Sequence, residues 1–411
     1  MNKTLKIAIY GFILFIFLYR PFSAIGVDAT VALLIAALLV IVYDIFKKGK
    51  YVLQFLKRKT YFLFVVGILL SSLICASSVA LNNINFTLYD LRIVQHLTML
   101  ANLVLALFII SKLSYSNFTR TDIFNLLINV AMAQGLICLL MLLIPPLREI
   151  AINIFVTNSH FEKGDFILTT RVYGLADSYT YGLPIVNGLI SGLCTKTYLD
   201  GERKNLYKIP IIFSAALLNG RTGIICGISS IIIAIVFVKT KNRIRSIIAG
   251  LLILLIAIIA LLVLKNIAPP VYAFMMQLTN LSQNDTFNRL IGDAIFFPGT
   301  ENLLFGVGSR VYGETGIRLI GKSSDVGFVN YIFLGGISYL FTIVTTYFLF
   351  IKNTIFSKGE KSISLFAMLL IVTAVSFWKG EIFNCSNYLM CIYFICSAGV
   401  IKTIIEKGEY I

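Results

Sequence analysis

Apolar runs separated by shorter polar segments recur along the whole chain. They lie near residues 5–20, 27–46, 60–81, 92–111, 122–144, 175–195, 206–220, 222–238, 246–264, 326–351, 362–378 and 382–400. A run of about 20 apolar residues is long enough to cross a bilayer as a helix. The pattern therefore predicts an all-α polytopic membrane protein with about 12 transmembrane helices. It predicts one integral membrane domain over residues 1–411.

Two of these runs fit the pattern less well than the others. The run at 175–195 contains glycines and Pro184, and the run at 206–220 is short.

The first apolar run of the chain, at 5–20, follows Lys3 and Lys6, as the apolar part of a signal peptide does. The many later runs favour an uncleaved first helix instead.

The longest polar interruption, residues 265–324, separates two apolar runs. It is rich in Gly, Arg, Asn and Asp, and it carries its own aromatic residues. A loop this long between membrane spans is usually functional or disordered. We expect it to bear short helices, to fold against the membrane and to carry the site.

Composition and charge set the class and the orientation of the chain. Hydrophobic residues make up 58% and charged residues 13%, whereas a soluble domain has about 25% charged residues. The net charge of +16 falls on segments such as 47–59, 196–208, 239–245 and 352–361. The positive-inside rule places these segments and both termini in the cytoplasm, and 265–324 outside. The excess charge then faces lipid, so no nucleic-acid partner is expected.

Cysteine and histidine usage gives no indication of a metal site or a cofactor. The seven cysteines fall inside or at the ends of apolar runs, and none has C-x-x-C spacing. We interpret them as small buried apolar residues. With only His96 and His160 present, a histidine-rich metal site is not expected.

Arg221, in the sequence N-G-R-T-G, joins two short apolar runs on the expected outer side. A cation at bilayer depth costs about 2.5–3.5 kcal/mol. Arg221 therefore either snorkels to the headgroups and binds the carbonyls that end the preceding span, or it offers a fixed guanidinium to a phosphate.

Arg289 and Asp325 are the other candidates for chemistry. Apolar residues around Arg289 recur at helical spacing over 287–295, and a solvated helix face is the alternative to a binding role. Asp325 opens the run at 326–351. It is either an N-cap or a carboxylate that takes a proton from an attacking hydroxyl.

Further motifs bring more charged residues to the same side. Arg171 and Asp177 either pair across a loop or bind substrate, and Arg310 follows F-G-V-G at 305–308. Residues 316–323 match a P-loop, but no α/β domain surrounds them, so we reject nucleotide binding. Lys322 is kept as a candidate anion ligand.

The order of the motifs along the chain resembles that in the O-antigen polymerase Wzy family and the related O-antigen ligases. The motifs are, in order, R-x-x-G-L-x-D-S, N-G-R-T-G, an outer-loop arginine, F-G-V-G and S-D-x-G-F-x-x-Y before Gly-Gly. The resemblance covers about residues 165–340. It implies a GT-C-type glycosyltransferase that joins lipid-linked glycans at the outer face of the bacterial inner membrane. It also implies that neither metal nor nucleotide sugar is needed.

The resemblance also implies roles for individual residues and partners. Catalysis is expected at Arg221, Arg289 and Asp325. The ligases carry a histidine where this chain has Asp325, which favours a polymerase. Expected partners are an undecaprenyl-pyrophosphate-linked oligosaccharide, the lipid bilayer, and the chain-length regulator and flippase of the same pathway. Outer-loop aromatics, including Phe274 and Tyr312, are candidates for stacking on sugars. Substrate binding is expected at Arg171, Tyr173, Asp177, Arg310, Tyr312, Lys322 and Glu381.

Two other functions stay open on sequence grounds. An O-antigen ligase uses the same chemistry with a different acceptor. A flippase or transporter of lipid-linked oligosaccharides would show paired halves and charges along a central cavity. Here the charges gather outside the spans, which favours the polymerase.

The predicted topology can be tested by cysteine labelling. Single cysteines at positions 204 and 282, introduced into a cysteine-free variant, are treated with a membrane-impermeant maleimide. We expect position 282 to react in intact cells and position 204 only after permeabilisation, because the basic segments face the cytoplasm. Labelling of position 204 from outside would overturn the topology.

Overall fold

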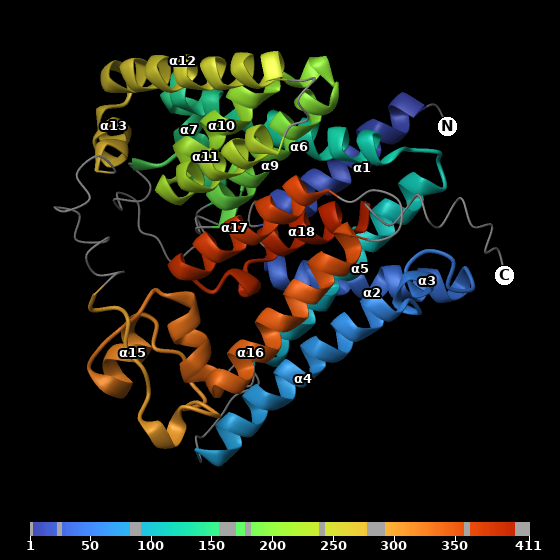
Figure 1. Ribbon diagram of the computed structural model, residues 1–411, viewed down its shortest axis with the longest axis vertical. Coiled ribbons are helices and arrows are strands. Elements are labelled where there is room, and N and C mark those ends of the chain that lie inside the picture. Colours follow the sequence, from blue (N-terminus) through green and yellow to red (C-terminus); the bar gives the residue numbers. More distant parts are fainter. Residues whose placement is uncertain are drawn as a thin grey trace.

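The structure is a computed structural model of the chain, and all regular elements of its described part are helices (Figure 1). It describes residues 3–22, 27–82, 92–155, 170–176, 182–237, 243–277, 292–356 and 362–398. No strand occurs within these ranges. The prediction of an all-α protein is therefore confirmed for this part of the chain.

A helix overlaps each of the expected apolar runs. These helices are α1 (Lys3–Tyr19), α2 (Ala29–Phe46), α4 (Lys59–Leu81), α5 (Ile93–Ser114), α6 (Arg120–Leu143), α9 (Gly182–Asp200), α10 (Lys208–Asn219), α11 (Arg221–Val236), α12 (Arg243–Ile267), α16 (Gly327–Ile355), α17 (Ile363–Lys379) and α18 (Ser386–Ala398). Five of them, α2, α4, α5, α6 and α16, are long and apolar enough to cross a membrane. These five candidate spans indicate a multi-pass membrane protein, and crossing by all the others stays a prediction.

Shorter helices lie between the long ones. They are α3 (Leu53–Leu56), α7 (Pro145–Phe155), η2 (Arg203–Asn205), α13 (Pro269–Met276), η5 (Thr300–Asn302), α15 (Gly313–Ile320) and η6 (Ile382–Asn384). The region 265–324 thus bears short helices, as expected, although its first residues extend α12.

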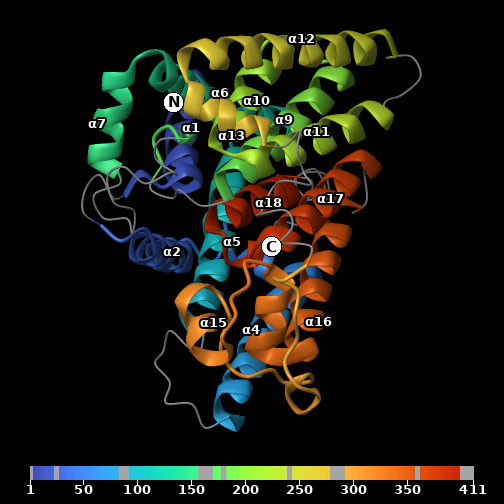
Figure 2. The ribbon, with the colours of Figure 1, turned by 90° about the vertical axis from the view of Figure 1, so that its left-hand side faces the viewer.

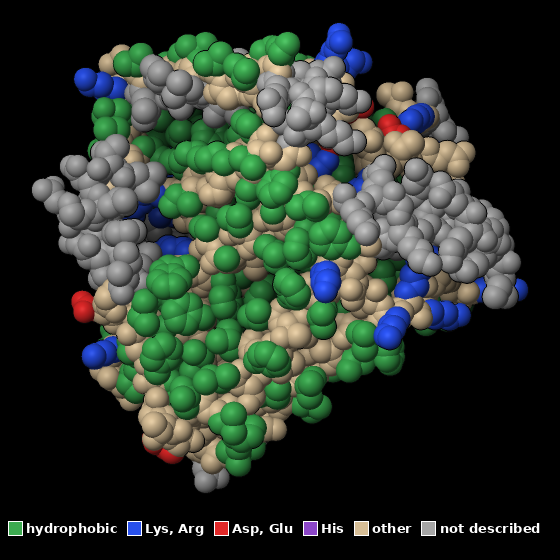
Figure 3. All heavy atoms as spheres, viewed as in Figure 1, with side chains coloured by type: hydrophobic (Ala, Val, Ile, Leu, Met, Phe, Trp, Pro, Cys, Tyr) green, Lys and Arg blue, Asp and Glu red, His purple; other side chains and the backbone are tan. Residues whose placement is uncertain are grey.

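The arrangement separates two ends of the helix bundle. In Figure 1, α3 and the start of α1 lie on the right, whereas α13 and α15 lie on the left. Figure 3 shows a broad hydrophobic surface across the middle of the same face, with most Lys and Arg side chains toward its left and right margins. This distribution fits a bundle whose middle faces lipid and whose two ends face water.

Helix α9 packs against α6, α10, α11, α17 and α18, and it is buried over nearly its whole length. A Cβ at Gly188 would lie 2.8 Å from the carbonyl oxygen of Gly223 on α11. Small residues allow two helix backbones to approach this closely. The weak hydropathy of the run at 175–195 thus reflects close helix packing. Residues 175 and 176, the first of this run, are irregular chain, and the described helix covers Gly182–Asp200.

Helix α16 is broken at Gly335 and Gly336, and the F-G-V-G segment fits into the break. Gly336 has φ 71°, in the left-handed region that favours glycine. The Val307 N–H donates to the Phe333 carbonyl at 2.7 Å, and a Cβ at Gly306 would lie 2.6 Å from the Gly336 nitrogen. The F-G-V-G segment thus crosses α16 at the break, and glycines on both segments allow the two backbones to approach this closely.

This crossing predicts a stability effect. Gly336→Ala should lower the melting temperature of the purified protein in detergent, because a Cβ there meets the Leu304 backbone in a strained conformation. The expected loss is on the order of 1–3 kcal/mol. Gly250→Ala in α12 is the matched control, because a Cβ there meets nothing within 4 Å. Equal melting temperatures of the two variants would contradict this account.

Candidate functional site

The segment 170–176 is held against the end of α10 by the buried side chain of Asn219. The Asn219 amide donates to the Val172 carbonyl, and the Val172 N–H donates to the Leu218 carbonyl at 3.0 Å. The Asn187 amide on α9 donates to the Asn219 oxygen at 2.8 Å. Tyr19 on α1 donates to the Asn187 oxygen at 2.8 Å. Three helices and one extended segment are thus joined by buried hydrogen bonds.

The glycine in R-V-Y-G-L has a local structural reason. The Gln134 amide on α6 donates to the Tyr173 carbonyl at 2.7 Å, and its oxygen accepts from the Leu175 N–H at 3.3 Å. Gly174 between them has φ 68°, and a Cβ there would lie 2.6 Å from the Gln134 nitrogen. A side chain at position 174 would therefore displace Gln134 and break the two hydrogen bonds that hold the backbone beside Arg171 and Tyr173.

Arg171 and Arg221 meet over one aromatic ring, and we call them the arginine pair. Their guanidinium carbons lie 5.0 Å and 4.6 Å from the centroid of Phe274 on α13. Arg171 also donates to the Tyr173 hydroxyl at 2.9 Å, and Arg221 donates to the Gln277 amide oxygen at 3.0 Å. The arginine that starts α11 is thus brought beside a residue 50 positions earlier in the chain.

The arginine pair has no carboxylate partner within the described ranges. The Nε of Arg171 is buried there without a hydrogen-bond acceptor. Arg148 on α7 holds the backbone beside this pair, since its Nη2 donates to the Arg171 carbonyl at 2.7 Å. Guanidinium groups arranged in this way match the oxygens of a phosphate.

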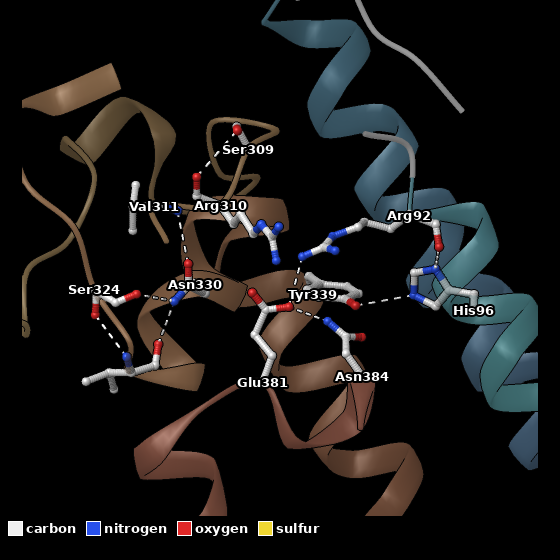
Figure 4. Close-up of polar contacts among 11 residues, drawn as sticks. Arg92, His96, Ser309, Arg310, Val311, Ser324, Asn330, Tyr339, Glu381 and Asn384 are labelled. Atoms are coloured by element: carbon white, nitrogen blue, oxygen red, sulfur yellow. Dashed lines mark hydrogen bonds and ion pairs between the residues drawn. The ribbon is translucent and has the colours of Figure 1, made fainter. Parts of the chain in front are cut away.

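A second group of polar side chains, the Glu381 cluster, lies where α5, α16 and η6 meet (Figure 4). Arg92 Nη2 lies 2.9 Å from Glu381 Oε2, and the side chains are 6% and 12% exposed. Asn384 donates to the same carboxylate oxygen. The Arg92 carbonyl contacts His96 Nδ1 at 2.7 Å, and His96 Nε2 contacts the Tyr339 hydroxyl at 3.3 Å. Glu381 is therefore fixed by two donors.

Arg310 and Tyr312 complete the Glu381 cluster on its open side. In Figure 4 the Arg310 side chain points toward Arg92 and Glu381. Its guanidinium lies 5.5 Å from the centroid of the Tyr312 ring and has no carboxylate partner within the described ranges. Burial and the nearby Asp325 raise the pKa of Tyr312. The Arg92–Glu381 ion pair thus lies beside a second arginine, Arg310, and beside a phenol that stays protonated at neutral pH.

Asn330 positions the chain around Asp325. Its oxygen accepts from the Val311 N–H at 3.0 Å, and its amide donates to the Ser324 carbonyl at 2.8 Å (Figure 4). The N-cap of α16 is Val326, and the Ser324 hydroxyl accepts from the Val326 N–H at 3.1 Å. The N-cap interpretation of Asp325 is therefore wrong, and its exposed carboxylate is not used to begin the helix.

The predicted site residues thus separate into two groups. Arg171, Tyr173 and Arg221 meet at the arginine pair, whereas Arg310, Tyr312 and Glu381 meet in the Glu381 cluster. Asp177 and Arg289 lie outside the described residues, and so does the proposed pairing of Arg171 with Asp177. Of the helix expected at 287–295, the described end, 292–295, is a turn and irregular chain.

Two smaller interpretations also have outcomes. Residues 316–320 end helix α15, and Gly321 closes it with φ 70°, so the segment is no phosphate-binding loop. Lys322, next in the chain, is exposed. The expectation that Phe274 stacks on a sugar is wrong, because its ring is 2% exposed and lies beneath the arginine pair.

Arg92 and Asn219 were not anticipated, although Glu381 was. Arg92 and Glu381 are 289 positions apart, so no local pattern indicates their ion pair. A possible signal for Asn219 was an amide inside an apolar run directly before Arg221. Within the described ranges no group of three His, Cys, Asp or Glu side chains could hold a metal ion.

Comparisons with known proteins give no relative: no family model, curated protein or solved structure matches this chain. The resemblance to O-antigen polymerases therefore rests on the ordered motifs alone.

Proposed function

We propose that this chain polymerises lipid-linked oligosaccharides at the outer face of a bacterial inner membrane. It would transfer a growing glycan from undecaprenyl pyrophosphate to a lipid-linked repeat unit. About 12 spans and cytoplasmic termini belong to this proposal, as do a flippase and a chain-length regulator as pathway partners. The observation that carries it is the arginine pair, two guanidiniums on one buried ring without a carboxylate partner in the described chain.

The arginine pair suits the leaving group of such a reaction. The bond between the sugar C1 and a pyrophosphate oxygen breaks, and negative charge develops on the departing pyrophosphate. Donors fixed where this charge develops stabilise the transition state, often as the largest single contribution. Arg171 and Arg221 are held in this way, by the Tyr173 hydroxyl and the Gln277 amide respectively. No nucleotide sugar is needed, since the lipid pyrophosphate already activates the glycan, and the proposal includes no metal or other cofactor.

The Glu381 cluster suits the acceptor sugar. Figures 1 and 2 show α13 and α15 on the same side of the molecule, with α13 in the upper part and α15 in the lower part. Tyr312 is 51% exposed and protonated, and it can donate to a sugar hydroxyl. Asp325 would take the proton of the attacking hydroxyl as the new glycosidic bond forms.

The proposal predicts a glycan phenotype for Arg221. A strain without the gene should carry one repeat per lipid anchor, and the wild-type gene should restore long chains. Arg221→Lys should not restore them at normal protein level, because a point charge does not replace the planar fork of arginine. Arg318→Lys is the matched control, since Arg318 is 81% exposed and pairs only with Glu314 on α15. Long chains with Arg221→Lys would contradict the role of Arg221, and long free polymer in the deletion strain would instead indicate a ligase.

A second prediction concerns Asp325. Asp325→Asn should slow polymerisation by the purified enzyme by about 10²–10⁴-fold, the range of general acid–base catalysis, because an amide does not accept the proton. Binding of the lipid-linked donor should not change. Glu314→Gln on the exposed face of α15 is the control. A normal rate with Asp325→Asn would show that another group takes the proton.

A further inference from the structure

An apolar groove, which we call the α12 groove, runs between α6, α10 and α12. In Figure 1, α12 lies across the top of the molecule above α10 and α6. The groove has a volume of about 220 Å³ and is lined by Leu139, Leu142, Ser214, Leu217, Leu218, Ile259, Val263 and Leu264. All of these side chains except Ser214 are aliphatic. An apolar cavity of about 150 Å³ stays dry and binds hydrocarbon, so this groove suits hydrocarbon rather than water.

The α12 groove lies close to the arginine pair. Leu217 and Leu218 are in the last turn of α10, which ends at Asn219, two residues before Arg221. The groove residues Leu217, Leu218 and Leu264 belong to the same hydrophobic cluster as Phe274, whose ring lies beneath both guanidiniums. The floor of the groove and the ring beneath the two guanidiniums thus belong to one hydrophobic cluster, beside two cations without a carboxylate partner in the described part of the chain.

From this proximity, and building on the proposed function, we infer that the α12 groove holds the isoprenoid chain of a lipid whose phosphate groups bind the arginine pair. The site has an apolar part and a cationic part, so it matches an amphiphile with an anionic head. A water-soluble phosphate would satisfy the cations and leave the groove empty. The buried Nε–H of Arg171, which lacks an acceptor within the described ranges, favours a head with several oxygens.

Val263 and Ile259 give the chain a route from the bilayer. They are 38% and 50% exposed on α12, whereas Leu217 and Leu218 at the floor of the groove are 6% and 2% exposed. The groove is thus closed toward the bundle and open along α12, where a helix of a multi-pass protein meets lipid. A lipid enters such a groove sideways, without its chain crossing water.

Photo-crosslinking tests the occupant directly. The full-length protein is purified in nanodiscs of phosphatidylethanolamine and phosphatidylglycerol, and undecaprenyl phosphate with a benzophenone in its isoprenoid chain is added. We expect crosslinks to peptides that contain Leu139–Leu142, Ser214–Leu218 or Ile259–Leu264. Crosslinks confined to other helices overturn the inference. Competition at equal concentration by phosphatidylglycerol overturns it also, because the occupant is then any anionic lipid.

Binding measurements separate the groove from the arginine pair. Ser214→Phe fills the groove and should weaken binding of undecaprenyl phosphate by about tenfold or more, while binding of inorganic pyrophosphate stays unchanged. Ile232→Phe places the same phenylalanine side chain on α11 at a position that is 53% exposed, and it should change the binding of neither ligand. Arg221→Ala should weaken the binding of both undecaprenyl phosphate and inorganic pyrophosphate.

The outcomes of these measurements are distinguishable. If Ser214→Phe binds undecaprenyl phosphate with wild-type affinity while Arg221→Ala binds it more weakly, the groove does not hold the isoprenoid chain. That result leaves the proposed function intact. Unchanged binding of both ligands by Arg221→Ala overturns the phosphate site of the proposed function. The crosslinking result uses the wild-type chain, so it decides the inference even where Ser214→Phe does not fold.

Discussion

The buried amide of Asn219 is the contact on which the candidate site depends. It ends α10, accepts from Asn187 and donates to Val172, so one side chain fixes two helices and the segment that carries Arg171. A buried polar group left without a partner costs about 1–3 kcal/mol, so these bonds hold the segment in one position. Because Arg221 follows two residues after Asn219, the same contact sets the spacing of both arginines.

Close backbone contact is the second constraint. Glycines bring α9 against α11, and they let the F-G-V-G segment enter the break in α16. The Glu381 cluster lies beside this crossing, and its central ion pair is buried. Removing one partner of a buried pair costs about 3–5 kcal/mol, whereas the intact pair contributes little net stability. Arg92 and Glu381 therefore specify how α5 and η6 meet more than they stabilise the bundle.

The sequence predicts the helices better than it predicts the side-chain groups, for a physical reason. Apolar runs determine helix positions locally, and every expected run overlaps a helix. Arg171, Tyr173 and Arg221 could be assigned to one end of the bundle because helix direction alternates along the chain. Contacts such as Arg92 with Glu381 depend on the packing of distant helices, which no short motif encodes. Phe274 was misassigned for the same reason, since its burial depends on α12 and α13 docking onto α10.

The arginine pair is a site whose free state is electrostatically unfavourable. Two cations at one ring repel each other, and cation–π contact offsets this only in part, with about 0.5–2 kcal/mol each. The repulsion persists because Asn219 and Gln134 hold the backbone of Arg171 independently of its charge. An arriving phosphate would remove the repulsion and would give the Arg171 Nε–H the acceptor that it lacks within the described ranges. Under the proposed function, the same arrangement would favour the state in which negative charge on the phosphate is greatest, which is the state of a departing pyrophosphate.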